Sequence, residues 1–150
     1  MISENNDIIS QTKKWFEVAV PNPTNKNIST QIGCHLEEVA EMLETISSVN
    51  KDDAKIIASL NDAIVYVANR VKQNGGIVVK DCIGLLDSLA DQIVTATGVG
   101  TFLGMNVPGA LAEVNRSNYS KFEDGEPVFN KNKKVMKGKD YTPPDLTQYI

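Results

Sequence analysis

Three long stretches of this chain repeat apolar residues every three or four positions, which is the spacing of one face of an α-helix. The first starts from an N-cap at position 29 or 30, and the second starts at position 52 or 53. The third runs from about Lys80 to Thr97 or a little beyond. The strand-like run at 77–79 is too short for a sheet element by itself. The pattern therefore predicts an all-α protein, a bundle in which short connections make neighbouring helices antiparallel.

Shorter segments complete the expected bundle. Ser10–Val18 has apolar residues at helical spacing and predicts a short first helix, whereas Val20–Asn27 is rich in proline and asparagine and predicts a loop. The pair Gly75 and Gly76 is expected to end the helix that precedes it. A fourth main helix is expected to begin near Pro108, a residue suited to a first helical turn, and to end at about Phe122.

The composition changes after Phe122, where the chain becomes polar and rich in Lys, Pro and Gly. A chain of 150 residues suits one domain, so we expect an all-α domain over residues 1–122. Residues 123–150 are then an extension that packs on the same domain or on a neighbouring subunit. Residues 128–129 and 135–136 flank a turn-like segment and predict a small hairpin. A floppy tail is the alternative; against it stand the candidate docking residues Phe129, Tyr141, Leu146 and Tyr149.

Charge and cysteine content narrow the classes of function. The chain has 15 Lys and Arg against 19 Asp and Glu, a net charge of −4, so duplex nucleic acid is not an expected partner. No apolar run approaches the ~18 residues of a membrane-spanning helix, so we expect none. The first ten residues lack a basic region followed by an apolar stretch, so we do not expect them to be a secretory signal. Cys34 and Cys82 form no metal-binding or redox pattern and are expected to be small core residues. We expect a cytoplasmic protein without a membrane partner.

The most informative residues are three glutamates, Glu37, Glu38 and Glu41, in the segment HLEEVAEMLE. On a helix they lie within one turn of each other, among apolar residues, where their charges repel. A bound cation would relieve this repulsion, and carboxylate oxygens favour Mg²⁺ or Mn²⁺ over Zn²⁺. The alternative is an ordinary charged helix face.

A second acidic pair, Asp87 and Asp91, lies one turn apart in the third long helix. Aspartate is a poor helix former, so two in an apolar helix suggest a function. If the two acidic helices pack antiparallel, their carboxylates meet, which is how helical bundles build metal sites. His35 is the only histidine and is interpreted as a packing residue or as a neighbour of the site.

These segments, taken in order, resemble the all-α nucleoside triphosphate pyrophosphohydrolases, and above all the small MazG-like proteins often encoded by bacteriophages. The superfamily also includes the dimeric dUTPases and the phosphoribosyl-ATP pyrophosphohydrolases. The resemblance covers roughly Trp15 to Leu146 and is carried by four segments: HLEEVAEM, LLDSLADQIVTATGVGTFLG, ALAEVNRSNYSKF and KVMKGKDYTPPDL. It implies a four-helix-bundle-type fold and a homodimer or homotetramer in the cytoplasm, which is the host cytoplasm if the protein is phage-encoded. It also implies Mg²⁺-dependent cleavage of a nucleoside triphosphate to the monophosphate and pyrophosphate.

The resemblance also assigns roles in the metal site. Glu37, Glu38 and Glu41 match the EExxE carboxylates, with Glu37 or Glu38 as the catalytic base, and Asp91 matches the aspartate of a second motif, ExxD. Ser88 stands where that motif has glutamate, and Asp87, one residue earlier, is the candidate replacement ligand. Mg²⁺ is the expected cofactor, with Mn²⁺ as the alternative.

Candidate substrate-binding residues lie outside the acidic helices. They are Trp15, Asn115, Arg116, Asn118, Lys121, Lys134 and Tyr141. Lysine suits a phosphate as a point charge, and Trp15 could stack on a base. The alternatives are core packing for Trp15, a surface charge or subunit ion pair for Arg116, and solvated charge for the lysines of the extension.

Three hypotheses of function remain open at this point. The first is a (d)NTP pyrophosphohydrolase, and the second is a base-specific hydrolase of the dUTPase or dCTPase type. The third is a non-catalytic helical module that binds a nucleotide or a protein, which Ser88 keeps open. Divalent-dependent release of pyrophosphate separates the first two from the third.

Overall fold

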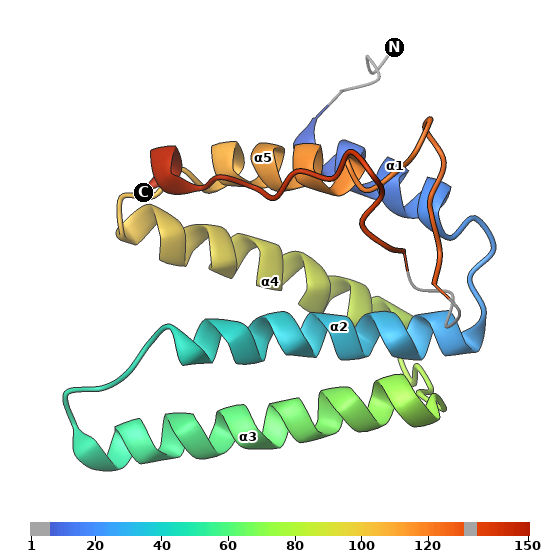
Figure 1. Cartoon of the computed structure of the whole chain (residues 1–150). Coiled ribbons are helices and arrows are strands. Elements are labelled where there is room, and N and C mark those ends of the chain that lie inside the picture. Colours follow the sequence, from blue (N-terminus) through green and yellow to red (C-terminus); the bar gives the residue numbers. More distant parts are fainter. Residues whose placement is uncertain (1–6, 131–134) are drawn as a thin grey trace. The chain divides into compact units, whose positions relative to one another are not determined.

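The computed structural model describes residues 7–130 and 135–150, and over these residues the protein is all-α, as predicted (Figure 1). The helices are α1 (Ile8–Ala19), α2 (Asn25–Glu44), α3 (Lys51–Asn74), α4 (Cys82–Phe102), α5 (Val107–Tyr119) and a short 3-10 helix, η1 (Thr147–Tyr149). Within the described ranges, none of the helices has the length and apolar character needed to cross a bilayer.

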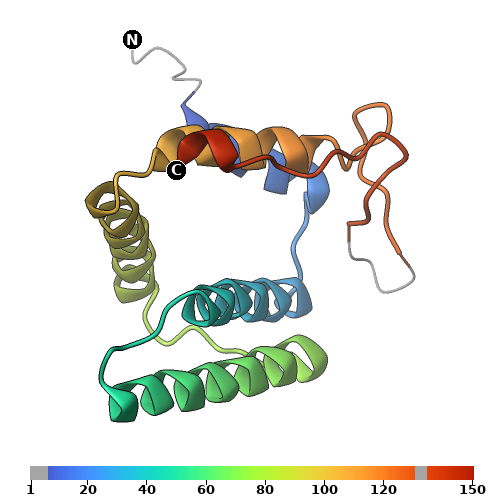
Figure 2. The ribbon, with the colours of Figure 1, turned by 60° about the vertical axis from the view of Figure 1, so that its left-hand side comes forward.

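The chain forms two compact units. One unit, Asn22–Lys80, holds α2 and α3, and the other combines Met1–Pro21 with Asp81–Ile150 and holds α1, α4, α5 and the extension. The first unit is a helical hairpin: α2 and α3 lie side by side and antiparallel (Figures 1 and 2).

Helix α2 begins at Asn25, so the predicted N-cap at position 29 or 30 is wrong. Thr24 is the N-cap instead: its hydroxyl accepts a hydrogen bond from the backbone N–H of Asn27 at 3.3 Å. The Asn27 side chain in turn accepts from the Thr24 backbone N–H at 2.9 Å, a reciprocal arrangement that satisfies two donors of the first turn. Ser29 lies inside the helix, fully buried, and its hydroxyl accepts from the N–H of Ile77 at 3.1 Å.

Small residues bring α2 and α3 close together. Ala40 and Ala68 are buried, and Gly33 lies so near α3 that a Cβ there would be 2.9 Å from the carbonyl oxygen of Ala68. Gly75 ends α3 with a φ of +66°, a conformation that favours glycine. The Lys26 ammonium then donates to the carbonyl oxygens of the last turn of α3, including that of Gln73 at 2.8 Å.

In the other unit, α1 packs against α5 through one buried amide and an aromatic cluster. Asn115 accepts from the Thr12 hydroxyl at 2.8 Å and donates to the Ile8 carbonyl oxygen at 2.9 Å. Trp15 stacks on Phe122, with ring centroids 5.6 Å apart. The last turn of α1 is thereby held to the end of α5.

The extension lies against α5. The Ser117 hydroxyl and the Arg116 guanidinium both bind residues 142–143 of the extension. At the predicted hairpin, the described residues Phe129 and Val135 form an antiparallel bridge, and the N–H of Met136 donates to the Val128 carbonyl oxygen at 2.7 Å.

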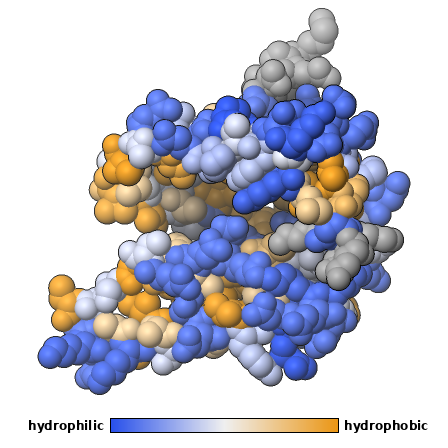
Figure 3. All heavy atoms as spheres, viewed as in Figure 1, coloured by the Kyte–Doolittle hydropathy of each residue, from blue (hydrophilic) through white to orange (hydrophobic). Residues whose placement is uncertain are grey.

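Helix α4 is apolar yet largely uncovered. Within its unit it packs against α5 near Gly100, and most of its large apolar side chains are exposed, with Leu86 at 70% and Val94 at 67%. Apolar side chains are visible where α4 leads into α5 (Figure 3). Cys82, at the start of α4, is exposed and Cys34 is half-buried, so the prediction of a core position is wrong for Cys82.

Candidate functional site

An acidic groove runs along α2 in the α2–α3 hairpin. Glu37, Glu41 and Glu44 are four and three residues apart, a spacing that places them on one face of the helix. With Ala40, Thr45 and Val65 they line a groove of about 620 Å³. The sequence analysis missed Glu44, although its position one turn beyond Glu41 was the signal that could have found it.

Glu38 is exposed and does not line this groove. It follows Glu37 by one residue, and on an α-helix one residue is a rotation of ~100°, so its side chain leaves the helix in another direction. The three predicted metal ligands of α2 therefore divide into two that face the groove and one that does not.

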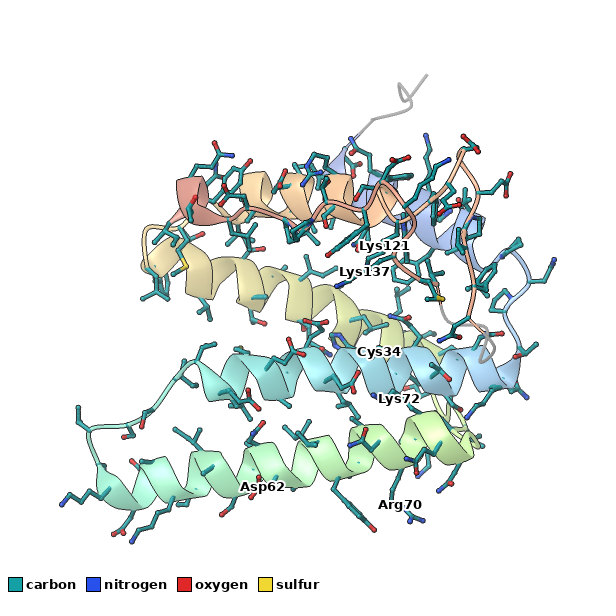
Figure 4. All side chains as sticks on the ribbon, in the orientation of Figure 1. Cys34, Asp62, Arg70, Lys72, Lys121 and Lys137 are labelled. Atoms are coloured by element: carbon teal, nitrogen blue, oxygen red, sulfur yellow. The ribbon has the colours of Figure 1, made fainter. Side chains whose placement is uncertain are left out.

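Glu37 already has a cationic partner. The Lys72 ammonium reaches from α3 to the Glu37 carboxylate, and its side chain is 24% exposed. Figure 4 shows Lys72 projecting from α3 toward α2. The stem of Lys72 passes over Gly33, one turn before Glu37, where a Cβ would lie 2.4 Å from the Lys72 Cγ. The contact between this lysine and the groove thus depends on the absence of a side chain at position 33.

Asn61 adds an amide oxygen to the same region of the hairpin. Its Nδ2 lies 3.5 Å from the Glu44 Oε1, while its Oδ1 is buried and accepts no hydrogen bond. A buried acceptor without a donor is costly, because it has lost water and gained no protein partner. A cation or a cation-bound water near this oxygen would remove that cost.

The donor set of the groove fits Mg²⁺. Carboxylate and amide oxygens are the ligands this ion prefers, and it is usually held by one or two carboxylates, several waters and the substrate's phosphates. Across the described ranges, no three Asp, Glu, His or Cys residues are gathered closely enough to hold an ion by themselves. A site with Glu37 and Glu41 as protein ligands, completed by water and phosphate, agrees with the ligand preference of Mg²⁺. It also needs no cluster of three such residues in the described ranges.

The second acidic pair belongs to the other unit. Asp87 and Asp91 lie one turn apart on the exposed surface of α4, next to Ser88. Their part in the metal site remains a prediction.

Two of the candidate substrate residues on α5 are engaged with other side chains. Asn115 is 2% exposed and both ends of its amide are bonded to α1, so in this structure it joins two helices. Arg116 donates to both oxygens of Glu113, at 2.7 and 2.8 Å, and to Thr142 and Pro143. These bonds make Arg116 the attachment point of the extension.

Three of the remaining substrate candidates, Trp15, Asn118 and Lys121, lie together at the end of α5. Lys121 donates to the Asn118 Oδ1 at 2.7 Å and lies 5.8 Å from the centre of the Trp15 ring, whose Nε1 donates to the Asn118 carbonyl oxygen. In the extension, the Lys137 ammonium lies 4.7 Å above the ring of Tyr141. Lys134 lies outside the described residues.

Hydrogen bonds from Arg116 hold the pKa of the Glu113 carboxyl at about 2, with a further bond from the Asp145 N–H acting in the same direction. Glu113 is therefore ionised throughout the physiological range, and the extension stays tied to α5.

Comparisons with protein-family models, with curated proteins and with solved structures found no match for this chain. Its function is therefore inferred from its own residues and their geometry.

Proposed function

We propose that this protein is a Mg²⁺-dependent nucleoside triphosphate pyrophosphohydrolase of the MazG-like type, which converts a (d)NTP to the (d)NMP and pyrophosphate. The observation that carries the proposal is the acidic groove, in which two carboxylates of the EExxE segment, Glu37 and Glu41, face the same space. The order of the four sequence segments described above supports the same reaction.

The carboxylates of α2 have two tasks in this reaction. Bound Mg²⁺ would supply neutralisation of the charge that develops on the phosphate oxygens. Glu41, with Glu37 or Glu44, would hold the ion on the groove face. Glu37 or Glu38 would accept the proton of the water that attacks the α-phosphorus, while the bond to the bridging oxygen breaks and pyrophosphate leaves.

Residues of the other unit supply further parts of the proposal. Asp87 and Asp91 are proposed as additional carboxylate ligands. Lys121, with Asn118, is the candidate phosphate contact, because lysine is a compact point charge on a flexible stem. Trp15 is already stacked on Phe122, which favours packing as its role, whereas Tyr141 remains a candidate for the nucleoside.

Release of pyrophosphate tests the proposal. Purified protein is incubated with each common NTP and dNTP and with dUTP, in Mg²⁺, in Mn²⁺ and in EDTA. We expect divalent-dependent release that falls about 100-fold or more in Glu41→Gln and in Glu37→Gln, the two carboxylates of the segment that line the groove, as for loss of a metal ligand or a general base. Glu17→Gln is the matched control, because Glu17 is an exposed glutamate of α1 in an ion pair with Lys13.

The outcomes separate the three hypotheses. Release from many nucleotides supports the general pyrophosphohydrolase, and release from dUTP or dCTP alone supports the narrower hydrolase. A folded protein that releases no pyrophosphate from any nucleotide in either metal contradicts the proposal and leaves the non-catalytic module.

We further propose that the protein assembles as a homodimer or homotetramer through α4. A helix with exposed apolar side chains along its length is normally buried in a larger assembly. A second copy of the same helix is the proposed cover, since two such helices would bury each other's apolar faces.

A further inference from the structure

Lys72 is placed to compete with a metal ion for Glu37. Its ammonium pairs with a carboxylate that also lines the acidic groove beside Glu41 and Glu44. In the absence of a divalent cation, Lys72 is thus the positive charge nearest to this part of the groove in the hairpin.

The fold gives this lysine a defined path. Gly33 and Lys72 face each other across the α2–α3 contact, and any side chain at position 33 would occupy the space of the lysine stem. The stem is thereby packed against α2, while the ammonium is at the edge of the groove, partly open to water. A packed stem with a partly exposed, three-donor head can exchange one oxygen partner for another without unfolding.

We propose that the Lys72 ammonium neutralises Glu37 while no metal is bound, is displaced from Glu37 when a divalent ion binds, and then binds a phosphate oxygen of the substrate. The proposal rests on the proposed function, because it takes Glu37 as a metal ligand. The ammonium and the divalent ion compete for the same carboxylate. Lys72 therefore lowers the affinity of the groove for a metal ion that binds without phosphate. Once displaced, the ammonium would be free to bind a phosphate oxygen of the substrate, whose negative charge it suits.

A consequence is that metal and phosphate bind cooperatively. Metal alone must displace Lys72 without compensation, whereas metal together with a phosphate anion offers the ammonium a new partner. A neutral residue at position 72 removes both the competition and the compensation, so it should tighten binding of metal alone and reduce the gain that phosphate brings.

Calorimetric titration with Mn²⁺ alone tests this, and needs no catalytic activity. Lys72→Met keeps most of the packed stem, Lys72→Gln is a second neutral variant and Lys72→Arg keeps the charge. We expect the neutral variants to bind Mn²⁺ about fivefold more tightly than the parent, the scale of a partly exposed ion pair, and Lys72→Arg to match the parent. Lys55→Met is the control for overall charge, because Lys55 is an exposed residue of the same helix. The titration is then repeated in the presence of inorganic phosphate, which binds free Mn²⁺ far more weakly than pyrophosphate does, at a concentration that keeps Mn²⁺ in solution. Phosphate should tighten Mn²⁺ binding more in the parent than in Lys72→Met.

The outcomes distinguish this inference from the proposed function. If the parent binds no Mn²⁺ up to millimolar concentrations, the metal site fails and the role of Lys72 fails with it. If the parent and the neutral variants bind Mn²⁺ equally tightly, the ion pair of Lys72 only joins α3 to α2. The inference then fails, while the proposed function stands. Failure of both neutral variants to fold would also overturn the inference, because it would show that the ion pair serves stability.

Discussion

Replacing Gly33 by alanine should destabilise the α2–α3 hairpin, although alanine is the better helix former. A Cβ at position 33 would lie 2.4 Å from the Lys72 Cγ and 2.9 Å from the Ala68 carbonyl oxygen. Favourable contacts of this kind are near ~3.5 Å, so the lysine stem must move and the two helices must separate. Overpacking costs about 1–3 kcal/mol, against about 1 kcal/mol gained from helix propensity. The expected net change is a destabilisation of about 0–2 kcal/mol.

Gly98→Ala is the matched control for this prediction. Gly98 is also inside a helix, α4, but a Cβ there would meet no atom within 4 Å. The propensity gain is shared, so the difference between the two variants isolates the cost of the clash, about 1–3 kcal/mol. Urea unfolding followed by circular dichroism gives both values. Equal stabilisation by the two alanines would refute the close approach of α3 to Gly33.

Three further predictions concern other parts of the chain. The pKa of Glu113 is lowered from 4.5 to about 2, so its contribution to holding the extension is present above pH ~4.5 and is lost as the pH falls toward 2. Limited proteolysis should therefore cleave the extension faster as the pH falls from about 4.5 toward 2. Glu113→Gln should already be cleaved faster than the parent at neutral pH, and its cleavage should depend less on pH. Thr24→Ala should cost about 1 kcal/mol in urea unfolding through loss of the α2 cap, and Thr24→Ser should not. Leu86→Glu and Val94→Glu should shift the oligomer toward monomer in sedimentation velocity, and unchanged sedimentation in both would rule out α4 as the interface.

The helices of this protein were largely predictable because helix formation depends on neighbours in sequence. Apolar spacing identified the long helices, and Gly75 ends α3 where the glycine pair indicated. The start of α2 was not predicted, because Thr24 and Asn27 lie in a segment whose prolines suggested a loop. A capping box is a local signal, and here it was outweighed by the stronger signal of Pro21 and Pro23.

The candidate site was predictable in its chemistry but only in part in its geometry. The acidic segment of α2 identified Glu37 and Glu41 as members of one cluster. It could not show that Lys72, 35 residues further along, is the partner of Glu37, because that contact depends on how α2 and α3 pack. For the same reason the sequence could not show that Asn115, a candidate substrate contact, is buried between α1 and α5.

The sequence by itself determined the all-α class, the order of the helices and the acidic character of α2, since each depends on residue types within a few turns of one another. Only the tertiary structure decided which carboxylates share the groove, which lysine meets them and which residues attach the extension. Those outcomes depend on the rotation and close approach of packed helices, where a single missing side chain at Gly33 determines what can pass between them.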